Sequence, residues 1–225
     1  MSKYTAIVLS AGKGRRMNSV IPKQYLDLCG MPVIVHSLLA FEKSKVDEIV
    51  IVCGTGDEDF VRTEIVEKYH IGKVNRIVEG GKERFNSVHN GLKACEDSDY
   101  VLIHDGARPY IGVDVINSNI DMLKEHPALV TAVVSTDTIK IVDDEGFVAS
   151  TPERKNCYII QTPQSFEYDI VKEAYDRYEK AVSEGTSFFA TDDASVVEEY
   201  TNVKVRVING DYGNIKITNP SDLKG

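Results

Sequence analysis

The segment Tyr4-Thr-Ala-Ile-Val-Leu-Ser-Ala-Gly-Lys-Gly-Arg-Arg-Met17 joins a short apolar run to a basic, glycine-rich turn. An apolar run that ends in such a turn predicts a strand followed by a phosphate-binding loop of an α/β protein. Gly12 and Gly14 lack a Cβ, so the backbone N–H groups of this turn can approach a ligand closely. Arg16 and the downstream Lys23 add positive charge to the same loop. The segment therefore predicts a polyanionic ligand, most simply a nucleoside triphosphate.

The turn fits neither of the two common glycine-rich phosphate motifs. A Walker A loop requires Lys-Ser/Thr after its last glycine, whereas Arg15-Arg16 follows Gly14 here. The dinucleotide fingerprint requires a third glycine at the position of Met17. What remains is G-x-G-x-R followed by Pro22-Lys23-Gln24, which looks like the nucleotidyltransferases that join a sugar phosphate to a nucleotide. A solvated basic loop built on a glycine turn is the alternative interpretation of this segment alone.

Composition and charge limit the kind of protein. A chain of 225 residues with 42% hydrophobic residues predicts one α/β domain, residues 1–225, with a full core. The formal net charge of −9 argues against nucleic acid as a partner. No apolar run approaches the ~18 residues of a membrane span and no signal-like segment begins the chain, so a cytoplasmic protein without membrane contact is expected. The four scattered cysteines are predicted to be reduced thiols.

Apolar, β-branched runs alternate with amphipathic stretches as far as Val134. This alternation predicts a Rossmann-like, mostly parallel sheet with helices on both faces and right-handed crossovers. Ligands of such sheets bind outside the carboxyl ends of the strands, so the loops after Leu9 and His104 are predicted to share one site. The predicted strands are Thr5–Leu9, Glu48–Val52, Val74–Glu79, Tyr100–His104 and Leu129–Val134, and the predicted helices are Val33–Lys43, Asp57–Tyr69, Arg84–Cys95 and Val113–Lys124.

The alternation breaks after Val134. Thr138–Val142 and Phe147–Ser150, joined by a glycine turn, predict a β-hairpin, and Tyr158–Ile160 predicts another short strand. Because residues 135–160 contain no partner helix, we expect them to project as a β-arm. A projecting hairpin has unpaired edges, which pairing with a second subunit would remove. A homodimer joined through the arm is therefore favoured over a flap that lies on its own sheet.

The main domain is expected to resume after the arm. Amphipathic stretches predict helices over Tyr168–Ser183 and Asp192–Tyr200, and a β-branched run predicts a strand over Val203–Val207. The segment Asn214–Thr218 alternates apolar and polar residues as a strand does, with both of its isoleucines expected to face the core. Lys216, between them, would then face either solvent or the site.

The segment His104-Asp105-Gly-Ala-Arg108-Pro109 ends a predicted buried strand. Asp105 at that position can hold Mg²⁺, which usually binds one or two carboxylates plus phosphate oxygens of a substrate. Arg108 could bind a second phosphate through two N–H groups. The structural alternative is an aspartate that caps the next helix, with the arginine paired to it. His104 points away from Asp105 if the strand continues, so we expect a core histidine rather than a base.

Two further segments carry residues suited to substrate contact. Gly80-Gly81, followed by Ser87, comes between a predicted strand and a predicted helix, where glycines would let a nucleobase approach and a hydroxyl could bind it. A plain strand-to-helix turn that binds no ligand would have the same sequence pattern. Thr191-Asp-Asp-Ala-Ser195 is either a helix N-cap with acids in its first turn or a hydroxyl that binds substrate.

Together these segments closely resemble one family, the cytidylyltransferases, and among them the 2-C-methyl-D-erythritol 4-phosphate cytidylyltransferases of the non-mevalonate isoprenoid pathway. The resemblance runs from Ile7 to Leu223. Any one segment is weakly specific, but eight in order with this spacing form a strong signature. The eight are Ala-Gly-Lys-Gly-Arg-Arg-Met, Pro-Lys-Gln-Tyr, Gly-Gly-x-x-Arg-x-x-Ser-Val, His-Asp-Gly-Ala-Arg-Pro, Asp-Thr-Ile-Lys, Gln-Thr-Pro-Gln-x-Phe, Thr-Asp-Asp-Ala-Ser and Asn-Ile-Lys-Ile-Thr.

The resemblance implies a reaction and a set of roles. It implies a homodimer interlocked by the β-arm, and transfer of CMP from CTP to the phosphate of methylerythritol phosphate with Mg²⁺ held by Asp105. The implied nucleotide-binding residues are Ser10, Ala11, Gly12, Gly14, Gly81 and Ser87. The implied catalytic residues are Arg16, Lys23 and Lys216. The implied contacts to the polyol phosphate are Asp105, Arg108 and Thr191, together with Thr138 and Arg154 of the partner subunit.

Two other functions compete with this interpretation. A ribitol 5-phosphate cytidylyltransferase would share most of these motifs and differ mainly in the polyol pocket, but Thr-Asp-Asp-Ala-Ser and the Arg-Arg pair favour methylerythritol phosphate. A non-catalytic nucleotide-binding protein could retain the same fold. The charged set of Arg16, Lys23, Asp105 and Lys216 is complete, which favours an enzyme.

Overall fold

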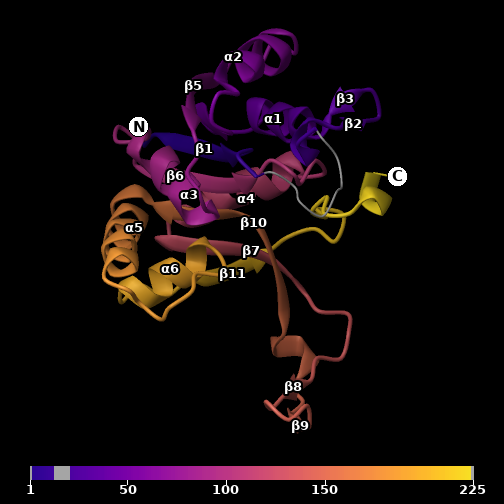
Figure 1. Ribbon diagram of the computed structural model, residues 1–225, viewed down its shortest axis with the longest axis vertical. Coiled ribbons are helices and arrows are strands. Elements are labelled where there is room, and N and C mark those ends of the chain that lie inside the picture. The colour runs from indigo at the N-terminus through magenta and orange to yellow at the C-terminus, as the bar shows by residue number, and fades with distance from the viewer. Residues whose placement is uncertain (1, 13–20, 224–225) are drawn as a thin grey trace.

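The structure of the protein is a computed structural model, which describes residues 2–12 and 21–223 (Figure 1). Its centre is a seven-stranded sheet, and the strand β10 runs antiparallel to both of its neighbours while the other pairs are parallel. The predicted α/β fold with a mostly parallel sheet is confirmed. In spatial order the strands are β11 (Arg206–Asn209), β7 (Ala128–Val134), β10 (Tyr158–Glu167), β6 (Tyr100–Asp105), β1 (Tyr4–Leu9), β4 (Glu48–Cys53) and β5 (Val74–Glu79).

Helices cover both faces of the sheet. Along β1 the side chains alternate, so that Ala6 and Val8 pack into one buried layer and Ile7 into the other. The first layer contains α1 (Val33–Lys43), α4 (Val113–Leu123) and the π-helix η3 (Val61–Glu67), which continues the short α2 (Glu58–Phe60). The second contains α3 (Arg84–Lys93), α5 (Tyr168–Ser183) and α6 (Asp193–Tyr200). The predicted helices are thus present, with that over Asp57–Tyr69 wound partly as a π-helix.

The strand β10 is much longer than the short strand expected at Tyr158–Ile160. It continues to Glu167 and inserts between β6 and β7. The sequence hides this strand because Pro163 has no N–H to donate and proline is disfavoured inside central strands. The pairing of β10 with β7 shifts register between Ile160 and Gln164, and the Pro163 carbonyl accepts a 2.6 Å hydrogen bond from the side chain of Thr131. The proline therefore lies in an irregular part of the strand.

An arm leaves the body of the molecule between β7 and β10 (Figure 1). Its tip is a two-stranded antiparallel sheet formed by β8 (Ile141–Val142) and β9 (Val148–Ser150), as the hairpin prediction required. The tip exposes apolar side chains, and Phe147 is 68% exposed. Exposed apolar surface of this kind is typical of protein–protein interfaces. Pairing of the arm with a second subunit stays a prediction.

The C-terminal segments differ in detail from the prediction. The edge strand β11 begins at Arg206 rather than Val203. Asn214–Thr218 forms no strand, but crosses the end of the sheet with the Ile217 N–H donating to the Ala107 carbonyl at 2.8 Å. Ile217 is fully buried, whereas Ile215 is 44% exposed. The expectation that both face the core was wrong, because this segment lacks the strict two-residue alternation of a strand.

No helix within the described residues is long and apolar enough to cross a membrane. All four cysteines carry free thiols, and burial raises the pKa of the Cys53 and Cys95 thiols to about 12, so both stay protonated at neutral pH. The remaining small elements are the hairpin β2 (Asp27–Leu28) and β3 (Met31–Pro32), the 3₁₀ turns η2 (Lys23–Tyr25) and η4 (Arg154–Asn156), and the C-terminal η5 (Pro220–Leu223).

Candidate active site

The described part of the glycine-rich turn after β1 is held from two sides. The Ser10 N–H donates to the Val52 carbonyl at 2.7 Å, which ties the turn to the neighbouring strand β4. The side-chain amide of Gln24 donates to the Ser10 carbonyl, which ties the turn to η2 and hence to the Pro-Lys-Gln motif. The start of the predicted phosphate loop therefore has a defined backbone shape. Two predicted site residues of this loop lie outside the described residues, namely Gly14 and Arg16.

A second glycine loop, which follows β5, packs directly against the first. A Cβ on Gly80 would overlap the side chain of Ala11 and lie 2.7 Å from Ser87 Oγ, so only glycine fits this approach. Ser87 Oγ accepts from the Gly81 N–H at 3.1 Å and donates to the Glu83 carbonyl at 3.3 Å. The tertiary structure thus brings together Ala11, Gly81 and Ser87, which were predicted to bind the nucleotide.

Asp105, the last residue of β6, is surrounded by cationic side chains. Lys216 Nζ lies 2.6 Å from Oδ2, Arg84 Nε lies 3.6 Å from Oδ1, and Arg108 Nε lies 4.0 Å from Oδ2. Burial alone would raise the pKa of this carboxyl, but the charges of Arg84 and Lys216 hold that pKa well below its usual range. Asp105 is therefore a carboxylate at neutral pH and can bind a cation.

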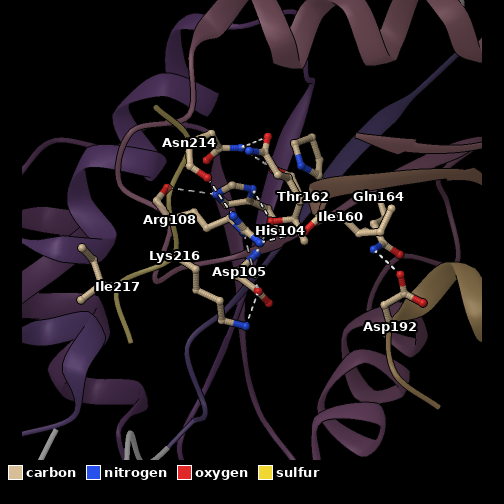
Figure 2. A network of polar contacts seen from close by, with 12 residues as sticks. His104, Asp105, Arg108, Ile160, Thr162, Gln164, Asp192, Asn214, Lys216 and Ile217 are labelled. Carbon is tan, nitrogen blue, oxygen red and sulfur yellow. Dashed lines mark hydrogen bonds and ion pairs between the residues drawn. The ribbon is translucent and has the colours of Figure 1, made fainter. Parts of the chain in front are cut away.

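The segment Asn214–Thr218 gathers basic side chains from distant parts of the chain. Figure 2 shows it beside Arg108, whose Nη1 donates to the Asn214 carbonyl at 2.7 Å. Lys23 Nζ donates to the Ile217 carbonyl at 2.8 Å. Since the segment crosses the carboxyl ends of the strands, the cations it holds face the edge where ligands of α/β sheets bind. Three predicted site residues meet there: Lys23, Arg108 and Lys216.

Arg108 already has backbone partners. Its Nη1 donates to Asn214, and its Nη2 donates to the Ile160 carbonyl of β10 at 3.3 Å. Its buried Nε makes no hydrogen bond to any described residue. Burial lowers the pKa of this guanidinium, although the charge of Asp105 opposes that effect. A guanidinium has five N–H groups and these bonds use two of them, so a phosphate could bind to the others, and this role stays a prediction.

His104 is a core histidine, as expected. It is fully buried, with Nε2 at 3.3 Å from the Arg108 carbonyl and Nδ1 at 3.0 Å from Thr162 Oγ1 (Figure 2). A carbonyl can only accept, so we assign the ring hydrogen to Nε2 and the lone pair to Nδ1. Burial lowers the pKa of the imidazole to about 4, and at neutral pH it is therefore uncharged.

The remaining predicted residues lie in two other places. Thr191 is exposed two residues before the start of α6, and Asp192, not Thr191, caps that helix by accepting from the Ser195 N–H at 2.9 Å. Thr138 and Arg154 contact each other on the arm, with Nη2 and Oγ1 3.1 Å apart. Both residues belong to the arm, which projects away from the sheet (Figure 1), and their contact is with each other rather than with Asp105.

Sequence analysis gave no role to Arg84, which links two parts of the site. Its Nη1 and Nη2 each lie 2.7 Å from one carboxylate oxygen of Asp193, while its Nε faces Asp105. Asp193 is fully buried and also accepts from the Tyr175 hydroxyl at 2.5 Å. The only signal in the sequence was that both partners belong to recognised motifs, Gly-Gly-x-x-Arg and Thr-Asp-Asp-Ala-Ser.

An excess of positive charge beside two glycine loops suits a reaction between two anions. With the site at the carboxyl edge of a parallel sheet, the fold and the site define a nucleotidyltransferase. The family model for IspD, 2-C-methyl-D-erythritol 4-phosphate cytidylyltransferase, matches residues 4–225. The chain therefore belongs to the 2-C-methyl-D-erythritol 4-phosphate cytidylyltransferase family, and the ribitol phosphate alternative is not favoured.

Individual relatives and solved structures agree with this assignment. Proteins of that name from Lachnoclostridium phytofermentans and Lachnospira eligens are each 48% identical to this chain, over 99% and 98% of it and 94% and 96% of their own lengths. The crystal structure of 4-diphosphocytidyl-2C-methyl-D-erythritol synthase from Anaerococcus prevotii matches with a TM-score of 0.86 at 35% identity, covering 99% of this chain and 93% of that one. The crystal structure of the cytidylyltransferase from Thermus thermophilus matches with a TM-score of 0.74 at 26% identity, covering 97% of this chain and 94% of that one.

The depressed pKa of His104 predicts a loss of stability in mild acid. Protonation of His104 costs more free energy in the folded than in the unfolded protein. The contribution of neutral His104 to the free energy of unfolding is therefore complete above pH 6.5 and is lost as the pH falls toward 4. We expect this residue to reduce the free energy of unfolding by about 2 kcal/mol between pH 7.5 and pH 5. Urea unfolding of the protein and of His104→Gln at both pH values measures the difference. An equal pH dependence of the two proteins would contradict this prediction.

Proposed function

We propose that the protein transfers CMP from CTP to 2-C-methyl-D-erythritol 4-phosphate, giving 4-diphosphocytidyl-2-C-methyl-D-erythritol and pyrophosphate. The observation that carries this proposal is the cluster of Lys216, Arg108 and Arg84 around Asp105, with Lys23 bound to the nearby Ile217 carbonyl, beside two touching glycine loops in a chain of this family. Four free thiols favour a reducing compartment, and we place the enzyme in the cytoplasm.

The chemistry needs charge and position more than a strong base. A phosphate monoester is an anionic nucleophile at neutral pH, and its oxygen attacks the α-phosphorus of CTP. A new P–O bond forms as the bond between the α- and β-phosphates breaks, and the electron pair leaves with pyrophosphate. The barrier is the approach of two anions and the charge that builds on the leaving group. Fixed cations and good alignment lower this barrier.

We assign the two substrates to neighbouring parts of the site. CTP would lie over the glycine turn, with its cytosine against the second glycine loop, and the residues assigned to it are Ser10, Ala11, Gly12, Gly14, Gly81 and Ser87. Arg16 and Lys23 would neutralise its phosphates in the transition state. The polyol phosphate would be held by Arg108, Thr191 and Lys216. This division is supported by the contact of Gly80 with Ala11 and by the bond from Lys216 to Asp105.

The residues present also fit a divalent cation. Within the described residues no group of three or more His, Cys, Asp and Glu side chains could hold a metal ion. Asp105 offers a single ionised carboxylate, which matches Mg²⁺ sites in which substrate phosphates and water supply the other ligands. When bound, the ion would add positive charge at the phosphate oxygens. Lys216 already pairs with the same carboxylate, so the lysine and the ion would share it.

We further propose that the site is completed by the arm of a second subunit. Arg154 and Thr138 touch each other on the arm, which projects away from the body of its own chain. Both could reach a polyol phosphate only in another subunit. The exposed apolar tip, which includes Ile141, Val142 and Phe147, would be covered in the same homodimer.

The substrate is tested by pyrophosphate release from CTP, with methylerythritol 4-phosphate and ribitol 5-phosphate assayed in parallel. We expect a preference for the first of about 10²-fold or more in kcat/KM, about 2.7 kcal/mol of discrimination. Removal of divalent cations with EDTA should abolish release, and Mg²⁺ should restore it. The opposite preference would overturn the substrate assignment, and full activity in EDTA would overturn the role given to the metal.

The charge of Lys23 is expected to act in the transition state. Lys23→Ala should lower kcat by about 10²–10³-fold, the scale for loss of one electrostatic partner of a transition state. Steady-state kinetics with both substrates measures the loss. Lys180→Ala, on the exposed face of α5, serves as the control and should leave kcat unchanged. A loss below about threefold would remove Lys23 from the catalytic set.

The arm is tested by mixing two defective variants. Arg154→Ala and Lys23→Ala should each be nearly inactive, whereas the neighbouring Lys155→Ala should not. If the arm acts in the partner's site, one site of each mixed dimer is intact, so an equilibrated equal mixture should regain about a quarter of the normal activity. No recovery, or a monomer in sedimentation, would contradict the proposal.

A further inference from the structure

We propose that Arg84 is a positioning residue for the polyol phosphate, because it fixes the start of α6 relative to Asp105. This proposal rests on the proposed function, in which Thr191, two residues before the start of α6, contacts that substrate. Arg84 begins α3, directly after the second glycine loop. It therefore stands between the carboxylate at the end of β6 and the first turn of α6.

Arg84 divides its guanidinium between two carboxylates. Nη1 and Nη2 form a two-pronged pair with Asp193, both at 2.7 Å, and Nε lies 3.6 Å from Asp105 Oδ1. The guanidinium is planar, so binding one carboxylate with the fork fixes the direction in which Nε points. A lysine carries the same charge on a single ammonium and cannot hold both carboxylates in this geometry.

Asp193 makes the connection a firm one. It is the first residue of α6, is fully buried, and also accepts from the Tyr175 hydroxyl of α5 at 2.5 Å. A buried carboxylate is costly unless it is paired and hydrogen-bonded, so the Asp193 carboxylate requires the guanidinium of Arg84 as its partner. Arg84 thus fixes the first turn of α6 relative to Asp105.

Loss of Arg84 is expected to weaken binding of the polyol phosphate but not of CTP, because the glycine loop proposed to contact cytosine is held by hydrogen bonds of its own. The loop that would read cytosine is closed by the bond from the Gly81 N–H to Ser87 Oγ, and Arg84 takes no part in it. The start of α6 has a second support from β10, where Gln164 donates to Asp192 at 3.0 Å (Figure 2). Gln164 also accepts from the Ala194 N–H at 2.8 Å. Loss of the Arg84 fork should therefore shift α6 without unfolding it.

The test compares Arg84→Lys with a matched change at the other end of the same helix. Arg177 of α5 donates to the carbonyl of Tyr200, the last residue of α6, at 2.8 Å. For Arg84→Lys we expect KM for methylerythritol 4-phosphate to rise about tenfold while KM for CTP changes less than about threefold. Arg177→Lys should change neither KM. Thermal unfolding checks that both variants are folded at the assay temperature.

Three results would overturn the proposal: no change in either KM for Arg84→Lys, an equal rise in both, or the same change in Arg177→Lys. Should Arg84→Lys fail to fold, Asp193→Asn breaks the same pair from the other side at nearly constant volume, and the same split in KM is expected. Thr191→Val separates this proposal from the substrate assignment. If Thr191→Val leaves both KM values unchanged while Arg84→Lys shows the split, Arg84 does not act through the start of α6 and this proposal is overturned, whereas the proposed reaction stands.

Discussion

The carboxylate of Asp105, buried at the end of β6, organises the charges of this site. It attracts three cations from three segments that are distant in the sequence: Arg84 at the start of α3, Arg108 in the turn after β6, and Lys216 near the C-terminus. A buried charge is tolerated only when it is compensated, so folding itself collects these cations. Because Arg84 is also paired with Asp193, these three cations and two carboxylates leave one positive charge in excess, in a chain whose formal net charge is −9. That local excess is what two anionic substrates need.

The antiparallel strand β10 connects this charge cluster to the rest of the molecule. The hydroxyl of its Thr162 accepts from the Asp105 N–H at 3.1 Å and contacts His104, and the Ile160 carbonyl accepts from Arg108. Gln164, farther along, supports the start of α6. The same strand begins at the base of the arm. The arm and the site are therefore joined by one strand, whose pairing is irregular around Pro163.

Much of the fold could be predicted because its signals are local. The runs that became β1, β4 and β6 are apolar and rich in β-branched residues, and burial on both faces produces such runs whatever their neighbours are. The helices on the two faces follow from the 3.6-residue period. The prediction failed where local signals mislead. Pro163 argued against a strand in the inner half of β10. The alternation of Asn214–Thr218 predicted a strand, although this segment is an irregular stretch that crosses the end of the sheet.

For the site, the sequence by itself determined which residues carry charge and which turns must be glycine, since these are properties of single residues and short motifs. It determined neither their partners nor their distances. Arg84 and Asp193 are separated by 109 positions, and Asp105 and Lys216 by 111. Such pairs form only because the strand order puts particular strand ends side by side, and because buried charges must find partners there. The tertiary structure alone therefore decided that Arg84 joins the two halves of the site.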